Sequence, residues 1–108
     1  ISPFNSQNTF LHRKVIPYYM VIPHIGRMDD IWGAYALQKD LRELYGSFIV
    51  YNNATVYHDR NEHDLTIDME DEMIGYRKTL DFILNNYRNV MPQKALDSYN
   101  LYKSIFNK

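Results

Sequence analysis

The stretch that decides the fold is residues 29–46, DDIWGAYALQKDLRELYG. Its apolar residues recur every three or four positions, at Ile31, Ala34, Leu37, Leu41 and Leu44. This spacing is typical of an amphipathic helix with one apolar stripe. The two leading aspartates suit the positive end of a helix dipole, where an Asp also accepts hydrogen bonds from unpaired N–H groups. We therefore predict a helix over residues 30–45, with an aspartate as N-cap and Gly46 at its C-terminal cap.

The segments on either side of this helix have the composition of strands. Residues 14–25 are rich in β-branched and aromatic side chains, but Pro17 and Pro23 each remove a backbone donor. They predict an edge strand or an extended segment. Downstream, residues 47–51 and 55–58 flank Asn52-Asn53, a pair that tolerates a tight turn. We predict a short β-hairpin there.

Two further helices follow in the second half of the chain. A long helix is predicted from His63, with an apolar stripe at Leu65, Met69, Met73, Tyr76, Leu80, Ile83 or Leu84, and Tyr87. Gly75 lies near its middle, where we expect a kink. Pro92 suits the first turn of a last helix. The apolar side of that helix carries Leu96, Tyr99, Tyr102 and Phe106.

These elements predict a small α+β domain dominated by helix. With 108 residues the chain has room for one compact domain, residues 1–108. Because the chain begins at Ile1 and not at Met, we expect it to be the C-terminal portion of a larger protein. We do not expect it to be a complete enzyme by itself.

Composition narrows the classes of partner. The net charge is −1, from 12 Lys and Arg against 13 Asp and Glu, which disfavours nucleic-acid binding because phosphate neutralisation needs a basic excess. The absence of cysteine excludes disulfides and thiol chemistry and is compatible with a reducing compartment. No apolar run approaches the roughly 20 residues that span a bilayer. We expect a soluble, cytoplasmic protein that does not bind membranes.

Two segments have side chains suited to chemistry. In residues 26–32, Asp29 or Asp30 has the character of a general base, and Arg27 beside them suits a phosphate. The structural alternative is a helix cap with Trp32 buried as an anchor. Residues 58–64 combine imidazoles and carboxylates, as metal sites do, but their spacing is not that of a zinc signature. The structural alternative there is a polar loop that caps the long helix.

The order of short motifs along the chain carries a resemblance. The motifs are Arg27-Met28-x-Asp30-Ile31-Trp32, Gln38, Arg60-Asn61-Glu62-His63-Asp64-Leu65, Asp71-Glu72 and Gly75-Tyr76. In this order they resemble the glycosyltransferase-like domain of plant STELLO-type proteins. The string Asp29-Asp30-Ile31-Trp32 is also similar to one in the reversibly glycosylated polypeptides. The resemblance covers roughly two thirds of the chain, from Phe10 to Tyr76.

The resemblance implies the second, acceptor-side half of a Rossmann-like, metal-dependent glycosyltransferase. Asp29 or Asp30 would be the catalytic base, and His58 a metal ligand. Substrate binding would fall to Arg27, Trp32, Arg60, Asn61 and His63. The intact parent would use a nucleotide sugar, an acceptor and a divalent cation, Mn or Mg. Because the nucleotide-binding half and its D-x-D motif are not in this sequence, we expect the isolated chain to be inactive, without a tightly bound metal.

Two alternatives come from other functional classes. One is a stand-alone, winged-helix-like module for nucleic acid, with Arg13, Lys14, Tyr18 and Tyr19 offering charge and stacking surfaces. The other is an oligomerising domain without a ligand, in which apolar and aromatic stripes on the last two helices pair between chains. For the isolated chain we expect self-association.

Overall fold

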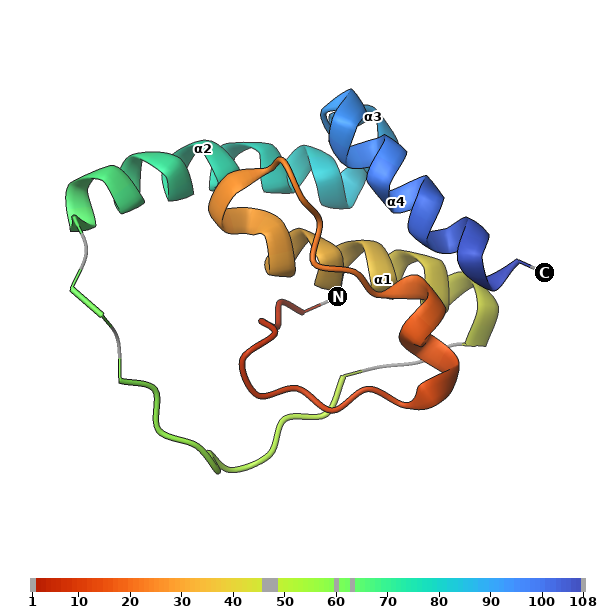
Figure 1. Cartoon of the computed structure of the whole chain (residues 1–108), viewed down its shortest axis with the longest axis horizontal. Helices are drawn as coiled ribbons and strands as arrows, with labels where there is room; N and C mark the ends of the chain where they lie inside the picture. Colours follow the sequence, from red (N-terminus) through yellow and green to blue (C-terminus); the bar gives the residue numbers. More distant parts are fainter. Residues whose placement is uncertain (1, 46–48, 60, 63, 108) are drawn as a thin grey trace.

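The computed structural model describes residues 2–45, 49–59, 61–62 and 64–107, and these residues form helices without any strand. Two 3-10 helices come first, η1 (Arg13–Tyr18) and η2 (Gly26–Met28). Four α-helices follow, α1 (Asp29–Tyr45), α2 (Leu65–Leu84), α3 (Tyr87–Val90) and α4 (Gln93–Phe106). Figure 1 shows α1 between the N-terminal segment on one side and α2 with α4 on the other.

The predicted α+β class is therefore wrong, and the described part of the chain is all-α. The first half of residues 14–25 lies in η1, with Pro17 inside it. Further along, the Ile22 N–H donates to the Asp29 carbonyl at 3.0 Å, within a tight local turn. Strand-forming side chains fix a strand only where a neighbouring backbone completes the ladder, and none does so here.

The predicted hairpin is also wrong over the residues that can be tested. Residues 49–59 are irregular, whereas 47 and 48 lie outside the described residues. The loop is tied to the N-terminal segment by side chains: Tyr51 Oη donates to the Pro3 carbonyl at 2.5 Å, and Asn8 Nδ2 donates to Thr55 Oγ1 at 2.9 Å. Neither a Rossmann-like half nor the wing of a winged helix is formed by the described residues.

The central helix is confirmed, but its start differs from the prediction. Because η2 runs directly into α1, Asp29 already has helical angles (φ −57°, ψ −48°) and does not act as an N-cap. Trp32, Tyr35 and Ala36 are buried in addition to the predicted stripe, so α1 is covered on more than one side. Gly46 lies outside the described residues.

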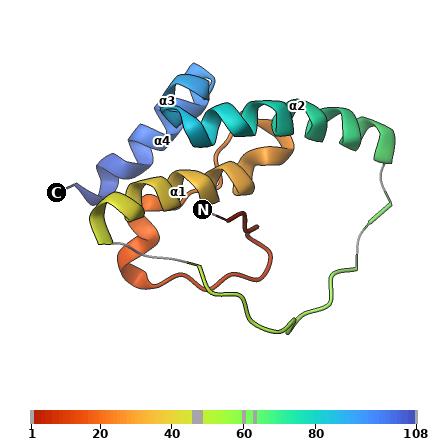
Figure 2. The ribbon, with the colours of Figure 1, turned by 180° about the vertical axis from the view of Figure 1, so that it is seen from behind.

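Asp64 is the N-cap of helix α2, since its Oδ1 accepts hydrogen bonds from Thr66 N–H at 2.9 Å and from Ile67 N–H at 3.4 Å. The helix runs unbroken through Gly75, so the predicted kink is not found. Gly75 serves close packing instead: a Cβ there would lie 2.2 Å from Met28 Cγ. The two long helices run in the same direction, and the irregular residues 49–59 lie between them in the sequence (Figures 1 and 2).

The C-terminal part contains one element that the prediction missed. Asn86 caps the short helix α3, so Tyr87 belongs to α3 and not to α2. Pro92 is the residue before α4, one position earlier than predicted. The core is a line of rings from four helices, α1, α2, α3 and α4. Its centroid distances are 4.7 Å for Trp32–Phe82, 5.4 Å for Phe82–Tyr87 and 5.9 Å for Tyr87–Tyr99. Within the described residues no helix is long and apolar enough to cross a membrane.

Candidate functional site

The two predicted catalytic aspartates begin α1 and take part in local contacts. Asp30 Oδ2 accepts hydrogen bonds from the Ser6 N–H at 2.9 Å and from Ser6 Oγ at 3.2 Å, so it holds the N-terminal segment against α1. Asp29 Oδ1 accepts from the Asp30 N–H at 2.7 Å. The buried hydroxyl of Tyr19 lies near both, and burial together with the two carboxylates raises the pKa of Tyr19 to about 12.

Arg27 and Trp32 bind to α2. Arg27 Nη1 lies 3.0 Å from Asp68 Oδ1, and its Nε lies 3.1 Å from Glu72 Oε1. The Trp32 side chain is buried, and its Nε1 donates to Thr79 Oγ1 at 2.9 Å. Trp32 is therefore a buried anchor of the helix, as in the structural alternative given above. Arg27 pairs with two carboxylates of the same chain.

The remaining predicted residues precede α2 in the sequence. His58 and Asn61 are exposed, and Arg60 and His63 lie outside the described residues. Among the side-chain contacts that the structure describes, none joins His58 or Asn61 to Asp29 or Asp30. The same part of the chain has no group of three His, Cys, Asp or Glu that would hold a metal ion. The divalent cation is predicted for an intact parent protein and not for this chain alone, so this finding does not bear on it.

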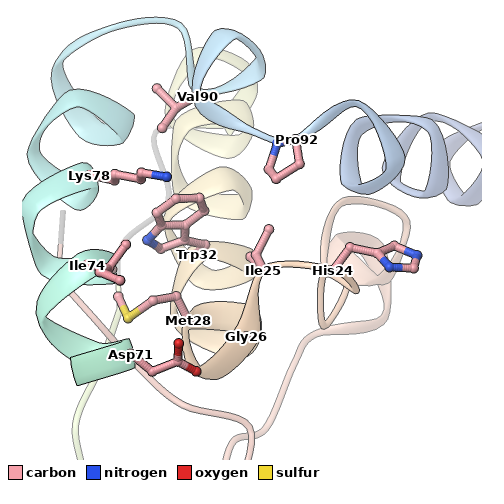
Figure 3. A pocket seen from close by; sticks show the side chains of 11 residues that line it. His24, Ile25, Gly26, Met28, Trp32, Asp71, Ile74, Lys78, Val90 and Pro92 are labelled. Carbon is pink, nitrogen blue, oxygen red and sulfur yellow. The ribbon is translucent and has the colours of Figure 1, made fainter. Parts of the chain in front are cut away.

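A pocket of about 180 Å³ lies beside the predicted segment (Figure 3). Its floor is apolar, with Met28 and Trp32, and Asp71 and Lys78 reach it from α2. Residues on both sides of Ile25 have left-handed backbone angles, with φ 68° at His24 and φ 63° at Gly26. Small-molecule sites usually occupy roughly 300–1,000 Å³, so this recess admits an apolar side chain and is too small for a nucleotide sugar.

A polar cluster around Asp40 joins α1 to α3 and α4, and the sequence analysis did not find it. Asp40 accepts hydrogen bonds from Tyr87 Oη at 3.0 Å and from Tyr99 Oη at 3.1 Å, and it pairs with Lys103. Burial raises the pKa of Tyr87 to about 12 and that of Tyr99 still further. The sequence signal for this cluster is Asp40 itself, a charged residue directly before Leu41 of the apolar stripe. The Asp40 carboxylate, both tyrosine hydroxyls and the Lys103 ammonium thus bind one another, so the cluster stabilises the fold.

The largest unpartnered feature is an apolar face of α2. We call it the outer stripe, and it consists of Met69, Met73, Tyr76 and Leu80. These side chains are 65%, 47%, 56% and 61% exposed. The buried side of the same helix carries Gly75 and Phe82. All four residues belong to the apolar stripe predicted for the long helix, and they are exposed.

The surface area of the whole chain is larger than that of a compact monomer of the same mass. The chain exposes 8173 Å², whereas a compact monomer of 12.9 kDa exposes about 6,300 Å². The excess is roughly 1,900 Å², about twice the roughly 800 Å² that each partner of a standard protein–protein interface buries. The irregular and largely exposed residues 49–59 contribute to this excess.

No protein-family model, curated protein or solved structure matches the chain. The resemblance to STELLO-type domains is thus not tested by any relative. The fold gives no support to a glycosyltransferase-like description, because that class is built on a sheet and the described residues are helical.

Proposed function

We propose that this chain is a helical association module that pairs with a second copy of itself through the outer stripe of α2. The observation that carries the proposal is the exposure of four large apolar side chains, spaced four, three and four residues apart, on one face of a long helix. This is the spacing of the a and d positions of a coiled coil. Exposed apolar surface of this extent is a mark of an interaction site.

The contacts at the start of α1 favour this function over a reaction. Asp30 is occupied by Ser6, Arg27 by two carboxylates and Trp32 by Thr79. The pocket next to them is small. A near-neutral charge supports a protein partner over a nucleic acid. A cytoplasmic location, expected from the cysteine-free composition, is part of the same proposal.

Sedimentation velocity over a range of protein concentrations tests the proposal. We expect the wild-type chain to sediment as a dimer, and Leu80→Glu to sediment as a monomer because its charge would be buried in the pair. Ile67→Glu is the matched control: Ile67 is 64% exposed on the same helix but lies about 140° around its axis from Leu80. This control should remain dimeric.

Circular dichroism measures whether the variants keep the helix content of the wild type. Both variants change exposed side chains, so their helix content should equal that of the wild type. A wild-type chain that stays monomeric at every concentration would refute the proposal. A Leu80→Glu variant that dimerises as well as Ile67→Glu would place the contact elsewhere and refute the role of the outer stripe.

A further inference from the structure

We infer that the two copies of α2 pair antiparallel, with Met69 of one copy against Leu80 of the other and Met73 against Tyr76. This inference rests on the proposed self-association and adds its orientation and register. Both pairs are centred at the same level of the helix, between Ile74 and Gly75. One two-fold axis at that level therefore satisfies both, as an isologous dimer requires.

The charges of α2 decide the orientation. The first ten residues of the helix carry four acids, Asp68, Glu70, Asp71 and Glu72, and no basic residue. The last ten carry Arg77 and Lys78 with one acid, Asp81. A parallel pair would place the two acidic halves side by side, and like charges across an interface are destabilising. An antiparallel pair places each acidic half against the basic half of its partner.

One specific ion pair follows from the register. Glu70 and Arg77 each follow a stripe residue on its outer flank and occupy equivalent heptad positions, and both side chains are exposed. In the antiparallel register Glu70 of one copy lies across from Arg77 of the other, and the symmetry repeats the pair. Neither residue forms an ion pair elsewhere in the described structure.

The inner flank of the stripe is already occupied by the fold. Glu72 is held by Arg27, and Thr79 accepts from Trp32, so these side chains fix the helix to its own domain. The charges left for a partner are those of the outer flank.

Disulfide exchange tests the orientation, because the chain has no cysteine and each engineered thiol is unique. The variants Met69→Cys and Leu80→Cys are mixed and equilibrated in a glutathione buffer. In the antiparallel dimer we expect the mixed disulfide to dominate. The two copies of position 69 would then lie about 16 Å apart along the helix axis, beyond the reach of a disulfide. Ile67→Cys, mixed with Leu80→Cys, is the control that should show no such preference.

Charge reversal tests the register. We expect Glu70→Arg alone and Arg77→Glu alone to weaken the dimer about tenfold, since each converts two weak attractions into repulsions. The double variant should recover the wild-type dissociation constant. A dimer that gives homodisulfides, or a double variant no better than the singles, would overturn the inference while self-association stands. The absence of any dimer would refute the proposed function itself.

Discussion

Among single residues, the buried phenols around Asp40 show how this small domain accommodates polar groups in its core. The Asp40 side chain is 14% exposed, and a carboxylate with so little access to water needs partners, because an unpaired charge is costly to remove from water. Asp40 has three: the hydroxyls of Tyr87 and Tyr99 and the ammonium of Lys103. These contacts require that both phenols keep their protons. The stability of the fold therefore depends on a proton equilibrium at alkaline pH.

This dependence gives a prediction for Tyr87. Its pKa is raised mainly by burial, to about 12, from an ordinary value of 10.0. The unfolded chain therefore loses the Tyr87 proton first, so the contribution of this residue is complete below pH 10 and is lost as the pH rises towards 12. We expect the urea midpoint of the wild type to fall over that range, and to fall less steeply in Tyr87→Phe.

A matched control separates Tyr87 from the general effect of alkali. Tyr57 is 91% exposed, so Tyr57→Phe should leave the fall as steep as in the wild type. Tyr19 and Tyr99 also have raised pKa values, so part of the decrease in the urea midpoint should remain in every variant. Equal slopes for Tyr87→Phe and the wild type would show that Tyr87 ionises freely in the folded chain.

At the scale of elements, the helices were predictable and their packing was not. The period of the apolar residues located α1 and nearly all of α2. The same period placed Met69, Met73 and Leu80 on one apolar stripe, and in the structure they face solvent. Periodicity finds an apolar face, but it does not identify which neighbour covers that face. The face that packs is defined by Gly75, whose missing side chain lets Met28 approach, and such a contact is invisible in either segment alone.

The candidate site, too, could be predicted from the sequence only in part. Residues 26–32 lie together because they are neighbours in the sequence, and part of this segment lines the pocket. Their partners Asp68, Glu72 and Thr79 come from α2, so the roles of Arg27 and Trp32 depend on contacts between distant segments. The strand prediction failed for a related reason. Local composition favours an extended chain, but a strand exists only with a partner strand.

A close approach between α1 and the segment before it gives the prediction at this scale. A Cβ at Gly33 would lie 2.2 Å from the Met20 carbonyl oxygen. In a helix without this contact, Gly→Ala stabilises by about 1 kcal/mol. At Gly33 the Met20 backbone would have to shift to make room for the new Cβ. We therefore expect Gly33→Ala to lower the free energy of unfolding by about 1–3 kcal/mol. The sign of the change in urea denaturation therefore tests the packing.

Gly75→Ala provides the comparison for Gly33→Ala. Its new Cβ would also meet an atom at 2.2 Å, but that atom is Cγ of the flexible Met28 side chain. The loss should be smaller than for Gly33→Ala, since a side chain rearranges more easily than a backbone carbonyl. A stabilised Gly33→Ala variant would show that the segment at Met20 does not lie against α1.

At the scale of the whole molecule, the shape is too open for an isolated domain. The radius of gyration is 14.6 Å, whereas about 13 Å is expected for a compact chain of this length. Figures 1 and 2 show the reason: the start of α2 and residues 49–59 extend away from the packed helices. Composition predicted one modest core, and the core of rings agrees with it. Composition could not predict that the longest helix packs on one side only.

An open chain that is completed by its own copy should gain stability with concentration. If two folded chains associate and two unfolded chains do not, the melting temperature rises with total protein. For a dimer of this size we expect about 3 °C for each tenfold increase, from the entropy of unfolding per residue. Differential scanning calorimetry over a hundredfold range measures this slope. Leu80→Glu should show none, whereas Ile67→Glu should keep it. A wild-type melting temperature that is constant over the range would mean that the outer stripe stays exposed in the folded protein.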